Sequence, residues 1–498
     1  MSESFLQKVN RKVNRQNLSK GVQYLKRNGV RSTLYKTMER LDEKEDGSYQ
    51  EKLLRLRPGE EMLREQKAKT YTHPYKISLL VPAYETEPRF LTAMVKSVIM
   101  QSYGNWELCI ADGSESDIVK NTVMDLIGRI PPEVAGRIRY RKLDGNGGIA
   151  ENSNAALEMA TGEYVGLLDH DDLLEPDALF EVMSVLSDNL SKDGNVYSNR
   201  IRAIYTDEDK VDLSGTCYYE PNYKPSFDID LLRSNNYICH FFVVRTELAR
   251  SAGGFLEEFD GAQDHDFMFR CLENIPVSAV AHIPKVLYHW RCHPESTALN
   301  PESKRYAYDA GLRAVEAHLK RKGIAARVEH TEHLGFFRVI YEAQPVTVRH
   351  LSRKQWDQMN REDLEKITED YIMILSDDLQ PMDPDYLAEL SGPMSRYEVG
   401  CVGGKIYDGR FRIESAGFTK GENGKYVPNF KGLNGHYSGY MHRASLLQRV
   451  DGVSLDCMLL RRSALDLGED KPFLASNYIV IFDPYAAFRR KPNRPWHS

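Results

Sequence analysis

The chain has 498 residues, 41% hydrophobic and 28% charged, a composition typical of a globular protein with about three domains. Its formal net charge of −6 argues against a general nucleic-acid binder. Seven scattered cysteines without a CxxC pair indicate no zinc site and suit a reducing cytoplasm. No apolar run approaches the length of a membrane span and no signal-peptide core is found, so we expect a cytoplasmic protein.

Residues 1–73 are expected to form a basic helical region and a linker. Residues 1–40 carry ten Lys or Arg against two Glu, a net charge of +8. A basic amphipathic helix can lie on an anionic membrane surface, although such a charge run is more often the solvated face of a packing helix. A peripheral position on the inner face of the cell membrane therefore stays open. Residues 41–73, with Pro58 and Gly59, are typical of a linker or a broken helix.

From residue 75, buried strands alternate with helices. Strand patterns at 77–81, 106–112 and 137–142 are separated by amphipathic patterns at 90–101 and 118–130. This βαβαβ order predicts a parallel sheet, whose ligands bind beyond the carboxyl ends of the strands. Asp112 ends the second strand, where it could meet a nucleobase or ribose.

A glycine-rich turn at residues 145–148 leads into an alanine-rich helix at 149–162. The glycines permit a close backbone approach to a ligand, and the helix N-terminus favours an anionic group. The turn lies in the third connection, so it is not a dinucleotide-binding fingerprint, and the chain has no phosphate-binding loop of the GxxxxGK[ST] type. Taken alone, such a turn is more often only a turn.

The segment 163–177 is the centre of the functional prediction. Its apolar strand ends directly in Asp169, His170, Asp171 and Asp172. Carboxylates gathered at a strand end repel one another, and their oxygens suit Mg²⁺ or Mn²⁺. The alternative is a solvated acidic turn that caps the next helix.

Further acids follow along the chain. A strand at 203–209 ends in acids, and the irregular segment 214–230 resembles a substrate-contacting loop. After a strand at 237–245, Asp264 and Asp266 stand at the start of a helix, where they either complement its dipole or supply a general base.

The second half of the chain partly repeats the first. Residues 370–394 echo the stretch from 163 onward, 451–467 echo 235–252, and 479–490 echo 280–291. Three blocks recurring in order argue against a chance likeness. The second copy has Ser376 where the first has Asp169 or His170, and nothing in it matches GAQDHD (261–266). We expect a degenerate unit that is structural or binds an acceptor.

The ordered set of motifs resembles a family 2 glycosyltransferase across residues 75–322, with a shortened relative at 345–495. The basic N-terminal region resembles that of bacterial cell-surface polysaccharide (rhamnan-type) transferases. The motifs are VPAYE (81–85), ADGSESD (111–117), GNGGIAENSNAAL (145–157), LLDHDD (167–172), YTDEDK (205–210), GAQDHD (261–266) and LYHWR (287–291).

The resemblance implies an α/β chain with a GT-A (Rossmann-like), mostly parallel sheet and flanking helices. The expected domains are the N-terminal region 1–73, a catalytic domain at 74–330 and a truncated, non-catalytic GT-A-like domain at 340–498. It also implies a nucleotide-sugar donor (UDP- or dTDP-linked), a glycan or lipid-linked acceptor, a divalent metal (Mn or Mg) and inversion at the anomeric carbon. A homo-oligomer stays open.

The resemblance assigns roles to single residues. Asp264 is the expected general base, although Gln263 replaces the Glu usual before it. The metal is expected on Asp171, Asp172 and His289. The donor-binding residues implied are Pro82, Tyr84, Glu85, Asp112, Asn152, Asp169, Asp171, Asp207 and Arg291. The alternatives are a catalytically inactive scaffold of a polysaccharide assembly complex and a sugar-nucleotide pyrophosphorylase; the latter would need a basic, glycine-rich first loop that VPAYETEPRF lacks.

Overall fold

A computed structural model describes residues 15–42, 48–193, 196–292, 305–466, 473–475 and 477–491. The chain divides into two compact units. The first unit comprises Glu45–Phe227 and Asn236–His318, and the second comprises Met1–Lys44, Asp228–Asn235 and Leu319–Ser498. The first fourteen residues of the basic segment lie outside the described ranges.

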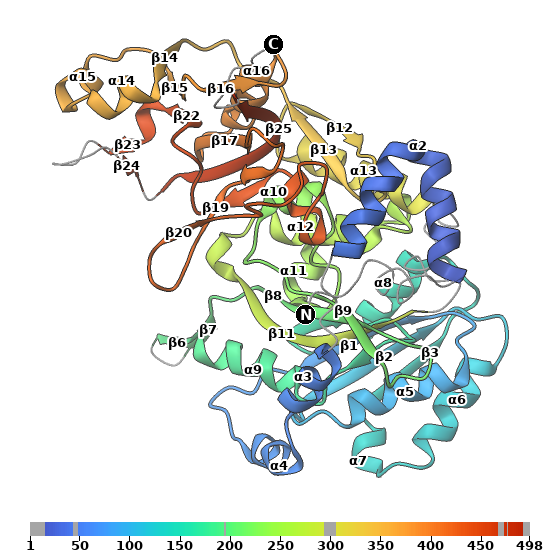
Figure 1. Cartoon of the computed structure of the whole chain (residues 1–498). Helices are drawn as coiled ribbons and strands as arrows, with labels where there is room; N and C mark the ends of the chain where they lie inside the picture. The colour runs from blue at the N-terminus through green and yellow to red at the C-terminus, as the bar shows by residue number, and fades with distance from the viewer. Residues whose placement is uncertain are drawn as a thin grey trace. The chain divides into compact units, whose positions relative to one another are not determined.

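The first unit is built on a nine-stranded sheet in the order β3-β2-β1-β4-β10-β8-β11-β5, with β9 paired to β8. Figure 1 labels β1, β2, β3, β8, β9 and β11 of this sheet. Strands β3, β2, β1 and β4 run parallel, whereas β10 runs antiparallel to both of its neighbours. The strands are β1 (Ile77–Ala83), β2 (Trp106–Asp112), β3 (Ile138–Lys142), β4 (Tyr164–Leu167), β5 (Leu173–Leu174), β8 (Ala203–Val211), β9 (Tyr218–Asn222), β10 (Phe242–Arg245) and β11 (Val280–Arg291).

Helices cover this sheet because their apolar residues recur at helical spacing. Leu91, Met94, Val95 and Val98 of α5 are all buried, and Pro88 begins that helix at a position where its missing N–H is not needed. The helices are α3 (Tyr49–Leu56), α4 (Glu60–Ala68), α5 (Pro88–Ile99), α6 (Ile118–Ile127), α7 (Pro132–Ala135), α8 (Ile149–Met159), α9 (Ala178–Asp188), α11 (Thr246–Ser251), α12 (Gln263–Leu272) and α13 (Arg305–Arg321). A small hairpin joins β6 (Leu190–Asp193) to β7 (Val196–Asn199).

Several local expectations need refinement. The stretch predicted as a linker or a broken helix contains two helices, α3 and α4, with Pro58 and Gly59 between them, which agrees with a broken helix. Tyr49 and Leu53 of α3 pack in a small core with Val211 and Tyr218. The segment expected to be irregular contains β9, which pairs with β8. The two helices expected at 304–322 are one helix, α13.

The second unit contains a shorter sheet with the order β14-β15-β22-β17-β25-β16. Neighbouring strands in this sheet have the same relative directions as those in the order β1-β4-β10-β8-β11-β5 of the first sheet. In both sheets the successive pairs are parallel, antiparallel, antiparallel, parallel and antiparallel. Within the described residues, β3 and β2 of the first sheet have no counterpart in this strand order. The strands are β14 (Val348–Ser352), β15 (Tyr371–Leu375), β16 (Leu379–Pro381), β17 (Val399–Tyr407), β22 (Cys457–Arg461) and β25 (Ile479–Arg490). The repeat inferred from sequence is therefore confirmed by topology.

The remaining elements of the second unit include β18 and β21, which pair with β17 and β25 of this sheet. Helix α10 comes from the first half of the chain but belongs to the second unit. Its buried Asp230 pairs with Arg233 at 3.0 Å and with Arg396 of the second unit at 2.9 Å. These elements are α2 (Arg15–Asp42), α10 (Ile229–Ser234), β12 (Ala326–His330), β13 (Phe337–Tyr341), α14 (Arg353–Gln358), α15 (Arg361–Glu365), α16 (Tyr386–Ser391), β18 (Ile413–Ser415), β19 (Phe418–Lys420), β20 (Tyr426–Pro428), β21 (Gln448–Val450), β23 (Leu465–Asp466) and β24 (Phe473–Leu474).

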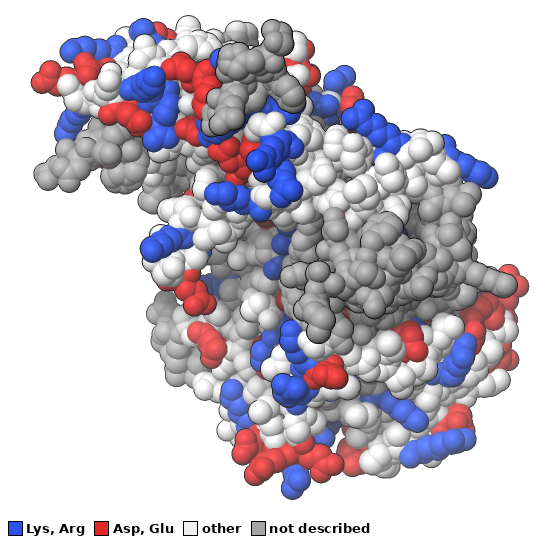
Figure 2. Space-filling view, viewed as in Figure 1, with Lys and Arg blue, Asp and Glu red and all other residues white. Residues whose placement is uncertain are grey.

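Surface charge and hydropathy agree with the composition. In the view of Figure 2, Lys and Arg are interspersed with Asp and Glu over the described surface, as expected from the small net charge. Among the described residues, none of the helices combines the length and the apolar character needed to cross a bilayer.

Candidate active site

The acidic cluster lies where β4 ends, at the carboxyl edge of the parallel strands. Asp172 is fully buried and accepts hydrogen bonds from the Tyr288 hydroxyl at 2.5 Å and the Arg291 backbone N–H at 2.7 Å. Burial, followed by the charges of Asp171 and Asp169, raises the pKa of Asp172 well above its usual range. A buried carboxylate under such repulsion is stabilised by a cation placed beside it.

Among the residues that the structure describes, Asp169, Asp172 and His240 form a group that could hold a divalent metal. One ligand atom from each lies within 4.8 Å of the others. Two carboxylates and an imidazole suit Mn²⁺, and also Mg²⁺ if water completes the shell. His240 was not among the predicted site residues, yet the strand register explains its place. Since Val243 of β10 lies opposite Gly166 of β4 in an antiparallel pair, His240 comes to the level of Asp169.

An ion pair within the same unit fixes the segment that carries His240. Lys224, whose side chain is fully buried, pairs with Glu208 at 3.1 Å and donates to the backbone carbonyls of Ile238 and His240. Glu208 in turn accepts a hydrogen bond from the His240 backbone N–H at 3.0 Å. Lys224 and Glu208 are therefore positioning residues for His240.

His289, predicted to bind metal, sits in a buried chain of charged groups. Its Nδ1 lies 2.6 Å from Asp209 and its Nε2 lies 2.9 Å from Glu175. Burial opposes the charged ring, but hydrogen bonds to these two carboxylates raise the pKa of His289 overall. Arg57 pairs with Glu175 at 2.6 Å, and the Tyr49 hydroxyl donates to Asp209 at 2.6 Å. Both ring nitrogens face carboxylates, an arrangement that favours a structural role; the metal role stays a prediction.

Arg291, predicted to bind the donor, is also engaged within the protein. Its Nε donates to the Asp171 carbonyl at 2.7 Å, and Nη1 lies 3.2 Å from the carbonyls of Asp212 and Leu213. The guanidinium carbon lies 4.9 Å from the centre of the Phe90 ring. Arg291 thus holds the backbone of the acidic turn in place, and contact with a donor stays a prediction.

The predicted nucleotide-side residues come together at the ends of β1 and β2, where Ala83 is opposite Asp112. Asp112 is fully buried and accepts hydrogen bonds from the Tyr140 hydroxyl at 2.6 Å and the Ser114 N–H at 2.9 Å. Glu85 is exposed, and Ser116 donates to it from both backbone and side chain, which lowers its pKa. Pro82 is half-buried, and Tyr84 stays 43% exposed, so its ring is open to a ligand.

Asn152 and Asp207 complete the predicted set. Asn152 of α8 is 3% exposed, and its Oδ1 has no hydrogen-bond partner among the described residues. A Cβ at Gly113 would lie 2.7 Å from Asn152 Nδ2, so a larger residue there would have to displace the Asn152 amide. Asp207 is 2% exposed and is bonded to His282 Nε2 at 2.8 Å. The N-terminus of α8, expected to favour an anion, is already capped by Asp260, which accepts from the Ala150 N–H at 3.1 Å.

Asp264 and Asp266 share the start of α12 but differ in surroundings. Asp266 is fully buried and pairs with Arg270 at 2.7 Å. Asp264 is half-buried and accepts a hydrogen bond from Asn236 Nδ2 at 2.8 Å. Burial raises the pKa of Asp264, with His240 opposing and Asp169 adding to the rise, so its carboxylate shares the electrostatic environment of the metal candidates.

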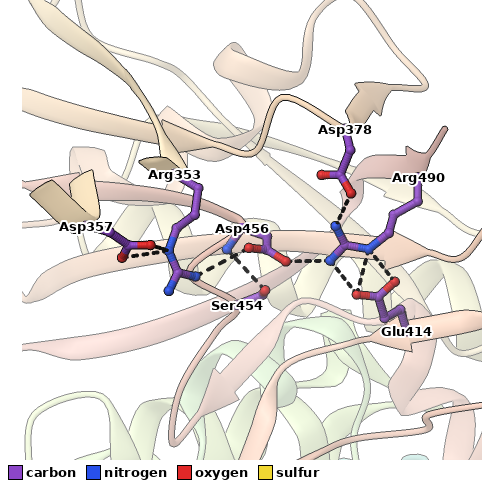
Figure 3. A network of polar contacts seen from close by, with 7 residues as sticks. All are labelled: Arg353, Asp357, Asp378, Glu414, Ser454, Asp456 and Arg490. Atoms are coloured by element: carbon purple, nitrogen blue, oxygen red, sulfur yellow. Dashed lines mark hydrogen bonds and ion pairs between the residues drawn. The ribbon is translucent and has the colours of Figure 1, made fainter. Parts of the chain in front are cut away.

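The corresponding strand end of the second unit is closed by an internal ion-pair network (Figure 3). Arg490 lies opposite Leu379 on β16, as His289 lies opposite Leu173 on β5. Its guanidinium pairs with Asp378 at 2.7 Å and Glu414 at 2.5 Å, and also with Asp456. Arg353 binds the other side of Asp456 at 3.3 Å. Arg490 therefore pairs with Asp378 and Asp456, which follow β15 and precede β22 as Asp172 follows β4 and His240 precedes β10.

The chain shows similarity to known proteins. An uncharacterized protein, y4gI, of Sinorhizobium fredii is 32% identical over 78% of this chain and 48% of its own length. The O-antigen biosynthesis protein RfbC of Myxococcus xanthus is 27% identical over 78% of this chain and 34% of its own. The β-1,3-glucosyltransferase WfgD of Escherichia coli, which uses UDP-Glc and α-D-GlcNAc-diphosphoundecaprenol, is 30% identical over 24% of this chain and 44% of its own. The chain thus spans a third to a half of the length of these relatives.

One family assignment agrees with this geometry. Residues 78–252 match the model of glycosyl transferase family 2. That segment contains β1, β2, β4, the acidic turn and His240, which are the parts that build the cluster described above. The α/β fold class and the resemblance drawn from the motifs are confirmed. Residues 78–252 of the chain are therefore similar to glycosyl transferase family 2.

Proposed function

We propose that the first unit is an inverting glycosyltransferase that moves a sugar from a nucleotide-diphosphate sugar to a hydroxyl of a glycan or lipid-linked acceptor. The observation that carries the proposal is the grouping of Asp169, Asp172 and His240 within 4.8 Å, beside a carboxylate, Asp264, held by an uncharged amide. The reaction needs a metal site that binds the donor diphosphate and a general base that takes the proton of the acceptor hydroxyl, and both should lie in one electrostatic environment.

Asp264 is proposed as the general base. The acceptor hydroxyl attacks the anomeric carbon while its proton passes to the Asp264 carboxylate, and the bond to the diphosphate oxygen breaks in the same displacement. The raised pKa of Asp264 makes it a stronger proton acceptor than an ordinary aspartate. Asp266 is less suited because Arg270 already neutralises it. A single displacement needs no covalent intermediate and therefore no second catalytic carboxylate.

The metal candidates fit a divalent cation in charge and ligand type. Asp169, Asp172 and His240 would hold it, and when bound it would neutralise the charge that develops on the leaving diphosphate. Arg291 and the Glu208–Lys224 pair keep these ligands in place through the backbone. Asp112, Glu85, Tyr84 and Pro82 are proposed to line the nucleotide, with Asn152 Oδ1 free to accept from the sugar or ribose.

The class of acceptor is proposed from the relatives. RfbC takes part in O-antigen biosynthesis, and WfgD acts on a diphosphoundecaprenol-linked sugar. A surface glycan or its lipid-linked precursor is therefore the acceptor we propose here, with a UDP- or dTDP-sugar as donor. A scaffold without activity is the less favoured alternative, because the first unit retains its whole acidic cluster.

Asp264→Asn tests the assignment of the base. It should lower kcat for sugar transfer by about 10²–10⁴-fold while the donor Kd changes less than a few-fold. Asp117→Asn is a matched control, because Asp117 is an exposed carboxylate of the same unit. Near-normal turnover of Asp264→Asn would show that another group accepts the proton.

The second unit is proposed to be non-catalytic. Arg490 binds Asp378, the carboxylate that follows β15 as Asp172 follows β4, so a diphosphate–metal complex would have to displace an internal arginine. In its described part, this sheet also has no counterparts of β3 and β2, and Asp112 at the end of β2 is one of the residues proposed to line the nucleotide. Asp377→Asn should accordingly leave donor turnover unchanged, and a large loss would restore a catalytic role to this unit.

Helix α2 is proposed to rest on an anionic membrane surface. Val30, Leu34 and Met38 are 75%, 56% and 41% exposed and follow one another at four-residue spacing. Arg31 and Arg40 are exposed on the same segment of α2, which follows a kink at Gly29. An apolar stripe among basic residues binds anionic lipid, and salt weakens the binding. Leu34→Glu with Met38→Glu should weaken sedimentation with phosphatidylglycerol vesicles, whereas unchanged sedimentation would contradict the idea.

A further inference from the structure

A cavity of about 210 Å³ opens in the second unit between α2 and the loops around residues 332–333 and 436–438. We call it the α2 pocket. It is separate from the acidic cluster of the first unit, and none of the motifs described above accounts for it. Its lining residues are Tyr24, Arg31, Ser32, Tyr35, Lys36, Glu39, Glu332, His333, His436 and Ser438.

The floor of the α2 pocket is held by a buried carboxylate. Glu39 is 4% exposed and accepts hydrogen bonds from the Gly439 N–H at 2.8 Å, the Lys36 ammonium at 3.0 Å and the Ser438 hydroxyl at 3.2 Å. These contacts join the helix to a loop about 400 residues away in sequence. Groups fixed in this way are pre-organised to bind a ligand.

Aromatic rings line the walls in stacked pairs. Tyr35 stacks on His436 with 3.8 Å between ring centres, and Tyr24 faces His333 at 6.1 Å. Tyrosine and histidine present an apolar ring together with a polar tip. Such walls suit a ligand whose faces are C–H and whose rim carries hydroxyl groups.

The charges of the α2 pocket cancel. Arg31 and Lys36 stand against Glu39 and Glu332, and burial, followed by the charge of Arg31, lowers the pKa of His436, which disfavours its charged form. A site of zero net charge does not select a diphosphate or another polyanion. Its volume is also below the roughly 300–1,000 Å³ typical of cofactor and drug-sized ligands, so a nucleotide sugar is too large.

We propose that the α2 pocket binds one uncharged sugar unit of a glycan chain. Size, net charge and the mixture of ring faces with hydroxyl, carboxylate and ammonium partners all match a monosaccharide ring. That this glycan is the acceptor rests on the function proposed above. Holding one unit of the chain here raises the effective concentration of the acceptor at the same protein without a new catalytic contact.

The test is direct binding of sugars to the full chain. Saturation-transfer-difference NMR with the methyl glycosides of glucose, galactose, N-acetylglucosamine and rhamnose at millimolar concentration should show binding of at least one. Ser32→Trp places an indole in the cavity and should weaken that binding by about tenfold or more. Thr37→Trp is the matched control, since Thr37 is exposed on the same helix and does not line the cavity.

Two outcomes would overturn the proposal: no glycoside binds the wild-type chain, or binding survives Ser32→Trp as well as it survives Thr37→Trp. Donor turnover is measured in parallel to separate this proposal from the proposed function. Loss of sugar binding in Ser32→Trp with unchanged release of nucleoside diphosphate supports the α2 pocket as a distinct site. Sugar binding by a chain that turns over no donor would leave the α2 pocket intact and refute the transfer reaction instead.

Discussion

Replacing His289 with phenylalanine separates its structural role from a metal role. Phenylalanine keeps an aromatic ring but lacks the two ring nitrogens, which in the wild type lie 2.6 Å from Asp209 and 2.9 Å from Glu175. Breaking a buried ion pair costs about 3–5 kcal/mol because a charge is left without its partner. Each carboxylate keeps one other contact, Tyr49 or Arg57, so we expect a loss near 3 kcal/mol. This is a large share of the 5–15 kcal/mol that is usual for a folded domain.

Urea unfolding followed by circular dichroism measures this loss, and calorimetric titration with Mn²⁺ measures metal affinity in the same variant. The structural role predicts a lower free energy of unfolding with Mn²⁺ affinity within a few-fold of wild type. His350→Phe, on an exposed site of the second unit, is the control for the substitution itself. Wild-type stability combined with a large loss of Mn²⁺ affinity would refute the reasoning and make His289 a ligand.

Three further predictions concern stability and the second unit. Burial raises the pKa of Asp483 from 3.8 to about 7, so the folded state binds its proton more tightly and stability falls as pH rises from 4 to 7. Asp483→Asn should remove that fall and raise the free energy of unfolding at pH 8, measured by urea titration, by up to about 4 kcal/mol. The prediction is contradicted if the stability of the variant depends on pH in the same way as that of the wild type. Arg490→Met should lower the free energy of unfolding by about 1–3 kcal/mol, because its three carboxylate partners are partly exposed. It should leave donor turnover unchanged, and an altered kcat would contradict the non-catalytic assignment of the second unit. Arg291→Lys removes the guanidinium Nε–H that donates to the Asp171 carbonyl, so it should weaken both Mn²⁺ binding and stability. An effect on the donor KM alone would instead indicate direct contact between Arg291 and the donor.

Much of the architecture follows from local pattern. Apolar runs that end in acids, alternating with amphipathic helices, specify parallel strands whose carboxyl ends meet at one edge. That edge is where Asp112 and Asp169 were expected and where the structure places them. The internal repeat also follows from sequence, because strand order depends on the same runs of apolar residues in both copies.

The parts that could not be predicted depend on contacts between distant residues. His240 reaches Asp169 through the antiparallel register of β10 on β4, which a strand pattern alone does not reveal. The pairing of Arg57 with Glu175 spans 118 residues, and nothing in the charged stretch before residue 73 indicates it. The α2 pocket likewise forms only because Glu39 meets a loop far along the chain.

Metal-dependent sugar transfer is tested by measuring release of nucleoside diphosphate from a panel of UDP- and dTDP-sugars, with Mn²⁺ or Mg²⁺ and with each metal removed by chelation. We predict that the wild-type chain turns over at least one donor, that chelation abolishes release, and that Asp169→Asn and His240→Ala each lower it sharply. The proposed metal-dependent transfer is contradicted if the wild-type chain releases nucleoside diphosphate from none of the donors. It is also contradicted if release is unchanged by both substitutions and by chelation.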